Sequence, residues 1–205
     1  MDLWECTDDK VWRLMESNYT KLIRPENITL ENEIESLSAD RVRNMTAEEF
    51  YSFLYHQYFV WKYTAKNRLA TTRAHLRYYE DHLDELEKIH QQLFAADHTD
   101  ILAILKVAKS IKGLGVAGAS GLLAVLFPHD FGTVDQFVVA RLKSFSTFST
   151  DQVIQNIHEQ SIKEKEAVYM EKLLRKKAAA LNLVNQSTYW TPRRIDKVLW
   201  AYERA

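Results

Sequence analysis

The residues of this chain best suited to chemistry are a group of glycines and the carboxylate that follows them. All five glycines fall within twenty residues, from Gly113 to Gly132, and Asp135 comes three residues later. Glycine is favoured where the backbone needs a positive φ or where another group must approach it closely. A carboxylate can stabilise a developing positive charge or activate a water molecule. The sequence therefore predicts one special turn, with an acidic group shortly after it.

The glycine spacing also matches a different motif. Gly113, Gly115 and Gly118 read G-x-G-x-x-G, the fingerprint of a dinucleotide-binding turn. An acidic residue, Asp135, lies about 20 residues further on, as that motif requires. The fingerprint has to follow a buried strand, however. The preceding apolar residues stand at positions 101, 104, 105, 108 and 111, which is helical spacing and disfavours a dinucleotide site.

Helical patterns extend over almost the whole chain, and no strand alternation accompanies them, so the sequence predicts an all-α fold. Thr46 and Glu49 form a capping box, and Thr191 followed by Pro192 marks the start of the last helix. Ser149 or Thr150 can cap the helix before it. The expected helices cover residues 46–61, 70–94, 100–112, 116–126, 135–143, 149–183 and 192 onward, with a loop over 127–132.

Residues 100–142 resemble the helix-hairpin-helix DNA glycosylase superfamily, of the endonuclease III and adenine glycosylase type. The matching residues are Gly113-Leu114-Gly115 in the hairpin, Ala119 in the next helix, and Val134-Asp135 with Val139 and Arg141. Small members of this fold share further residues with the chain. These are Trp61-Lys62 and, near the C-terminus, Arg193, Asp196, Leu199, Trp200 and Tyr202.

The resemblance implies two helical subdomains that flank a DNA cleft. In this chain residues 61–144 would form the helix-hairpin-helix subdomain. Residues 1–60 would pack with residues 145–205 to form the other one. The implied partner is duplex DNA, bound by a monomer.

The hairpin is the expected DNA contact. Consecutive N–H groups in a tight turn form an anion-binding concavity, and the helix that starts near Val116 adds the positive end of its dipole. The residues assigned to this contact are Lys112, Gly113, Leu114, Gly115, Val116, Ala117 and Gly118. In the family, carbonyls of the turn also hold a monovalent cation, the one cofactor that the resemblance implies. The alternative is that the glycines only close a pair of helices.

Asp135 is the implied catalytic carboxylate for hydrolysis of the N-glycosidic bond of a flipped base. Bifunctional members use a lysine at the position that holds Ala117 here, and alanine cannot act as a nucleophile. The resemblance therefore implies a monofunctional glycosylase. Asp135 can equally be a plain helix cap. Gly118 also departs from the Thr or Ser that the family often has, which leaves open a non-enzymatic DNA-binding or interaction module.

Aromatic residues supply candidates for gripping a flipped base. The candidates are Tyr58, Trp61, Phe127 and Phe131. Core packing is the alternative role for each of these rings. The seven histidines form no metal-binding pattern, so no metal site made of side chains is expected.

Composition limits the remaining possibilities. Cys6 is the single cysteine, which excludes an internal disulfide and a four-cysteine iron–sulfur cluster. No stretch of 18 apolar residues and no signal-peptide pattern occurs, so we expect a cytoplasmic protein without a membrane segment. The net charge is −1, but five basic residues and no acidic one lie between Trp61 and Tyr79. That run either faces phosphates or forms a solvated helix face.

Overall fold

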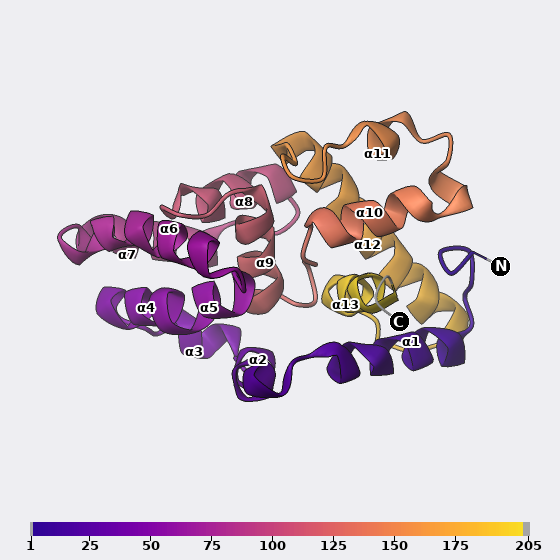
Figure 1. Ribbon diagram of the computed structural model, residues 1–205, viewed down its shortest axis with the longest axis horizontal. Coiled ribbons are helices and arrows are strands. Elements are labelled where there is room, and N and C mark those ends of the chain that lie inside the picture. Colours follow the sequence, from indigo (N-terminus) through magenta and orange to yellow (C-terminus); the bar gives the residue numbers. More distant parts are fainter. Residues whose placement is uncertain (1, 203–205) are drawn as a thin grey trace. The chain divides into compact units, whose positions relative to one another are not determined.

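Every regular element within residues 2–202, the part of the chain that the computed structural model describes, is helical (Figure 1). The prediction of an all-α fold is therefore confirmed. No helix in that part combines the length and the apolar character needed to cross a bilayer. The chain divides into two compact units. The middle unit is Arg24–Leu126, and the terminal unit joins the residues up to Ile23 with those from Phe127 onward.

These boundaries differ from the ones expected at residues 60/61 and 144/145. Residues 24–60 belong to the middle unit, because helix α4 (Ala47–Phe53) packs against α7 (Leu83–Ala95). Residues 127–144 belong to the terminal unit, because α10 (Gln136–Ser144) packs against α13 (Pro192–Tyr202). The packing partners of short amphipathic helices determine the division, and helix periodicity does not identify those partners.

The middle unit is a run of short helices around one apolar core. Its elements are η1 (Pro25–Asn27), α2 (Ile28–Glu35), α3 (Ala39–Arg43), α4, the π-helical turn η2 (Leu54–Tyr58), α5 (Phe59–Lys62), α6 (Lys66–Leu76), η3 (Arg77–Glu80), α7, α8 (Ile101–Ser110) and α9 (Val116–Leu126). The core includes Leu54, Leu76, Leu86 and Ile104, each without exposed surface. The expected helix pair on either side of the glycine turn is present as α8 and α9.

The helical segment from Ala47 to Lys62 starts as predicted, with a capping box formed by Thr46 and Glu49. It contains a π-helical turn that the sequence did not indicate. The guanidinium of Arg73 donates two hydrogen bonds to the Tyr55 carbonyl in this turn, at 2.9 and 2.7 Å. A side chain from α6 therefore satisfies a carbonyl of the π turn, where the regular ladder is altered.

The single helix expected over residues 70–94 is wrong, because α6 ends at Leu76 and α7 begins at Leu83. Between them lies η3, followed by Asp81 and then His82, which has the non-helical angles φ −138° and ψ 46°. Tyr79 in η3 is buried, and its hydroxyl donates to the Ser110 carbonyl at 3.2 Å. This tertiary hydrogen bond holds the interruption against the end of α8, while the apolar spacing continues across it.

The terminal unit contains the last two helices of the chain, α12 and α13, and the elements packed around them. Its elements are α1 (Asp9–Leu22), α10, η4 (Ser146–Phe148), α11 (Gln152–Asn156), α12 (Glu164–Asn185) and α13. Helix α13 packs against α1, α10 and α12. Trp12 is fully buried and donates from Nε1 to the Cys6 carbonyl at 2.8 Å. Pro192 is the first residue of the last helix, as predicted.

The single helix expected from Ser149 or Thr150 to residue 183 is also wrong. Asp151 caps α11 and accepts hydrogen bonds from the N–H groups of Val153 and Ile154, at 2.9 and 3.0 Å. Helix α11 ends at Asn156, and α12 begins only after Lys163. The helix therefore starts at the carboxylate of Asp151, which accepts from two amides, and not at the hydroxyl of Ser149 or Thr150.

Candidate nucleic-acid interface and carboxylate site

The turn between α8 and α9 is held by two backbone hydrogen bonds. The Leu114 N–H donates to the Ile111 carbonyl at 3.0 Å, and the Ala119 N–H donates to the Gly115 carbonyl at 2.8 Å. The second bond is the first of the α9 ladder. The N–H groups of residues 116–118 precede it and therefore point out of the helix end.

The two glycines of the hairpin, Gly113 and Gly115, differ in whether the fold requires glycine at their positions. Gly113 has φ +94°, and a Cβ there would lie 2.5 Å from the Thr72 carbonyl oxygen and 3.0 Å from Cε2 of Phe59. Gly115 is exposed, has no positive φ, and no atom lies within 4 Å of the place where its Cβ would be. The fold therefore requires glycine at 113. At 115 no packing contact requires glycine, and the backbone is exposed.

The remaining glycines of α9 allow close helix packing. A Cβ on Gly118 would collide with the Tyr63 hydroxyl, and one on Gly121 would lie 2.8 Å from the Tyr58 hydroxyl. Tyr58 donates to the Gly118 carbonyl and has no exposed surface. Trp61 is half-buried and donates from Nε1 to Glu31 at 2.7 Å. Both aromatic candidates of this unit thus have packing and hydrogen-bonding roles.

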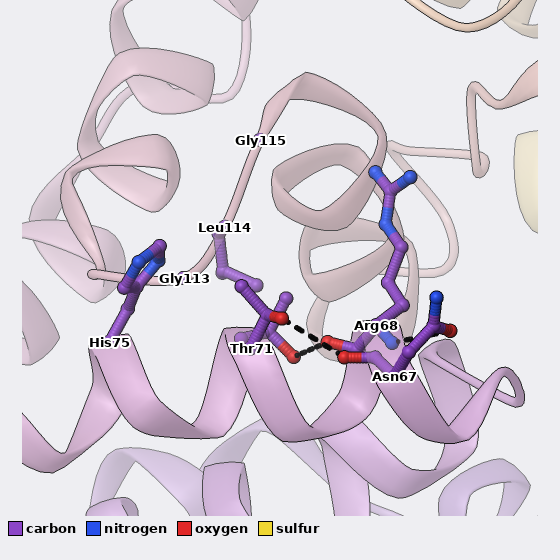
Figure 2. Close-up of a pocket in the computed structure, with 8 residues that line it drawn as sticks. Asn67, Arg68, Thr71, His75, Gly113, Leu114 and Gly115 are labelled. Atoms are coloured by element: carbon purple, nitrogen blue, oxygen red, sulfur yellow. Dashed lines mark hydrogen bonds between the residues drawn. The ribbon is translucent and has the colours of Figure 1, made fainter.

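A groove lies beside the hairpin, between it and α6 (Figure 2). Its volume is about 490 Å³. The lining residues are Asn67, Arg68, Thr71, Thr72, His75, Gly113, Leu114 and Gly115. Figure 2 shows Arg68 at one end of the groove, His75 at the other, and Leu114 between them. No acidic residue lines the groove, so its electrostatic character is basic and polar.

Lys112 stands at the hairpin side of a second hollow of about 500 Å³, which shares His75 and Gly113 with the groove. The Lys112 N–H donates to the Tyr79 hydroxyl at 3.2 Å. Its ammonium lies 4.1 Å from the centroid of the half-exposed Tyr78 ring, a cation–π contact. The charge of Lys112 is therefore held beside the turn.

The basic run between Trp61 and Tyr79 serves two purposes. Arg73 holds the Tyr55 carbonyl, and Arg77 donates to the Tyr55 hydroxyl at 3.1 Å. These two arginines support the π-helical turn. Arg68 lines the groove and is exposed. Part of the run is thus structural, and part is available to an anionic ligand.

Asp135 belongs to the terminal unit, where it caps α10. Its Oδ1 accepts hydrogen bonds from the N–H groups of Phe137 and Val138, at 3.0 and 3.3 Å. The residue is half-buried, and its backbone is extended, with φ −140° and ψ −177°. The predicted helix start is confirmed, and the catalytic role of Asp135 stays a prediction.

Two buried carboxyl groups hold the segment that leads to Asp135. Oε2 of Glu171 accepts from the Gly132 N–H at 3.1 Å, and Oδ2 of Asp196 accepts from the Thr133 N–H at 2.5 Å. Arg193 donates to the other oxygen of Asp196 at 2.9 Å. The Arg193 and Asp196 pair is therefore the part of the C-terminal motif that fixes this segment.

Burial raises the pKa of Glu171 well above its usual value. The Gly132 N–H lowers this pKa, nearby Asp196 raises it further, and Arg175 lowers it. Burial also raises the pKa of Asp196 to about 6, against the opposing effect of Arg193. Oε1 of Glu171 has no hydrogen-bond partner among the residues that the structure describes. An unpaired buried oxygen costs less in a neutral acid than in a carboxylate, which is consistent with the raised pKa.

The two aromatic candidates of the terminal unit are core residues. Phe131 has no exposed surface, and the guanidinium of Arg175 lies 4.7 Å from its ring centroid. Phe127 is also buried. Neither ring presents an open face in this structure, so gripping a base would require a rearrangement.

The chain was compared with known proteins by sequence and by structure. Comparisons with protein families, with curated proteins and with solved structures find no match. Within residues 2–202 no three side chains of His, Cys, Asp or Glu gather as a metal site would require. Sequence patterns did not indicate the buried carboxyl group of Glu171, or the place of Asn67, Thr71 and His75 in the groove. Arg68 belongs to the basic run for which a contact with phosphates was one of two predicted roles. The run of basic residues without acidic ones was the available signal for α6.

We expect the two hairpin glycines to respond differently to alanine. Gly113→Ala places a Cβ against the Thr72 carbonyl at a positive φ, so the free energy of unfolding should fall by about 1–3 kcal/mol. Gly115→Ala should change it by less than about 1 kcal/mol, because that Cβ enters open space. Urea denaturation of both variants measures the difference. Equal losses would contradict the distinct reasons given for the two glycines.

The raised carboxyl pKa values predict a loss of stability as pH rises. The unfolded chain releases these protons near pH 4. Folded Asp196 keeps its proton to about pH 6, and burial also makes folded Glu171 keep its proton well above its usual range. The folded state therefore holds more protons in this window, and the free energy of unfolding falls with rising pH. Glu171→Gln cannot ionise, so it should raise the melting temperature at pH 8 and flatten the pH profile. An unchanged profile in this variant would contradict the assignment.

Proposed function

We propose that this protein binds the backbone of duplex DNA through its hairpin and hydrolyses the N-glycosidic bond of a flipped base. In this proposal Asp135 is the catalytic carboxylate. The observation that carries the binding part is the open backbone at Gly115, in a turn where only Gly113 is required by the fold. The catalytic part rests on the resemblance of the segment from the hairpin to Asp135 to the helix-hairpin-helix glycosylases.

The hairpin supplies the groups that a phosphate needs. The N–H groups of residues 116–118 point out of the α9 end, where the helix dipole favours an anion. The ammonium of Lys112 lies beside the same turn and adds a charge-assisted contact. A side chain at Gly115 would occupy the space that a phosphate oxygen needs. These features support sequence-independent binding that weakens with salt.

The proposed reaction breaks the bond between sugar C1′ and the base nitrogen. Positive charge develops on the sugar, and the carboxylate of Asp135 stabilises it electrostatically. Water then adds to C1′, its proton is lost to a base such as the carboxylate, and the released nucleobase takes up a proton. Ala117 offers no amine at the family's Schiff-base position, which supports release of the base without cleavage of the strand.

The second candidate function is a non-enzymatic DNA-binding module on the same scaffold. A specific observation favours it, since Oδ1 of Asp135 already accepts two backbone hydrogen bonds as a helix cap. Capping alone would be a sufficient reason for aspartate at this position. The buried rings of Tyr58 and Phe131 also favour it, because neither provides a ready surface for a base. Both candidates share the hairpin contact and differ only in the role of Asp135.

Two substitutions at Gly115 test the hairpin contact. Asp and Asn both suit the position before a helix, and their Cβ enters open space, so both variants should fold normally. Gly115→Asp should lose at least ten-fold in affinity for duplex DNA, since one like charge at close range costs more than about 1.4 kcal/mol. Gly115→Asn should lose less, because it carries no charge. Fluorescence anisotropy with a labelled duplex measures both affinities. Equal affinity of the aspartate variant and the wild type would exclude the hairpin.

A substitution of Asp135 separates the enzyme from the module. Asp135→Asn keeps the shape and the capping ability, so the variant should fold normally and bind DNA at least as well. Base release should fall by about 100-fold or more, as when an electrostatic stabiliser is removed. The assay compares base release by wild type and variant from duplexes with a panel of modified bases. Equal release by both proteins would refute the catalytic role, and no release by wild type would favour the module.

A further inference from the structure

The groove beside the hairpin continues along α6 past the turn. The groove and the second hollow share His75 and Gly113 as lining residues. Together their lining residues extend from Asn67 to Tyr78. Within α6, the span from Asn67 to His75 is eight steps of the helix, or about 12 Å. This length exceeds what a single phosphate at the hairpin would occupy.

The close contact at Gly113 joins the hairpin and α6 into one surface. The space for a Cβ at Gly113 is already taken by the Thr72 carbonyl, so the turn lies directly on the helix. Residues of α6 on the groove side therefore lie beside the hairpin amides. Thr71 from α6 and Leu114 from the hairpin both line the groove at this junction.

The exposed side chains of the groove are hydrogen-bond donors of the kinds that contact phosphates. Asn67, Thr71 and His75 are exposed and lie four residues apart on one face of α6, with a rise of about 6 Å per step. Guanidinium, amide and hydroxyl groups supply most side-chain contacts to nucleic-acid backbones. The side chains of Arg68 and Lys112 form no salt bridge with any residue that the structure describes.

The amide of Asn67 is already oriented in part. Its oxygen accepts a hydrogen bond from the Arg68 N–H at 2.9 Å, which leaves the NH₂ group as the outward donor. The Thr71 hydroxyl donates to the Asn67 carbonyl at 3.0 Å, and it can redirect that donor to a ligand by rotation about one bond. Neither hollow is lined by a carboxylate that would repel a polyanion.

We propose that this face of α6 is a phosphate track, along which one DNA strand continues from the phosphate held at the hairpin. The track residues on α6 are Asn67, Arg68, Thr71 and His75, and Lys112 lies beside the hairpin in the hollow that shares His75. The proposal rests on the proposed DNA binding and adds a second, independent stretch of contacts to it. A row of donors along a helix suits an extended polyanion, whereas a small anion would need only one end of the groove.

Substitutions on α6 test the track separately from the hairpin. Thr71→Asp introduces a charge in the middle of the row, and Thr71→Asn is the matched neutral control, since residue 71 is exposed in a helix interior. The aspartate variant should lose at least ten-fold in duplex affinity, for the same reason of like charge at close range. The asparagine variant lacks the added charge, so it should lose clearly less affinity than the aspartate variant. Circular dichroism verifies that both variants are folded.

Arg68→Gln provides a second and quantitative measurement. Loss of one phosphate contact should reduce the slope of log affinity against log salt by about 0.9. Between 50 and 200 mM salt the wild type should therefore lose about 3.5-fold more affinity than the variant. Arg41→Gln is the charge-matched control, because Arg41 is exposed on α3 and lines neither hollow. Its slope should equal that of wild type.

The outcomes distinguish the track from the hairpin. If Gly115→Asp abolishes binding while Thr71→Asp and Arg68→Gln leave affinity and salt slope unchanged, the track is refuted and the hairpin contact stands. If Thr71→Asp weakens binding clearly more than Thr71→Asn, and Arg68→Gln lowers the salt slope, the track is supported. If the wild-type protein binds no duplex DNA, both the proposed function and the track fail.

Discussion

The contact between Gly113 and the Thr72 carbonyl is the constraint on which the candidate interface depends. No side chain fits between these two backbones, and the positive φ of Gly113 sends the chain into the turn before α9. The turn therefore lies on α6, and a groove forms where the two meet. A bulkier residue at 113 would move the hairpin away from α6 and separate the amides from Arg68 and its neighbours.

In the terminal unit, buried carboxyl groups fix the position of the loop before Asp135. Gly132 and Thr133 lie in a loop that cannot satisfy its own N–H groups, and Glu171 and Asp196 accept hydrogen bonds from them. Burying two carboxyl groups is unfavourable, and the ion pair with Arg193 offsets part of this cost for Asp196. The raised pKa values reflect this imbalance. The loop before Asp135 is thus held at the expense of stability at high pH, a pattern often found near functional segments.

The residues with functional potential separate into a binding group and a chemical group. In the binding group, no packing contact requires glycine at 115, and exposed polar side chains of α6 line the adjacent groove. In the chemical group, Asp135 has a sufficient structural reason as a helix cap. The two candidate functions share the proposed hairpin contact, and the role of Asp135 is the point on which they differ.

Sequence alone determined the all-helical fold, the glycine turn between two helices, the cap at Asp135 and the proline start of α13, because each depends on neighbouring residues. Tertiary structure decided the interruptions after Leu76 and Asn156, since apolar spacing continues across a break that a distant contact such as Tyr79 with Ser110 holds. It also decided which glycine the fold requires, because only packing shows Thr72 against Gly113 and nothing against Gly115. The burial of Glu171 beneath Gly132 joins residues 39 apart in the chain. No local pattern encodes such a contact, because its energy comes from groups that meet only after the helices have packed.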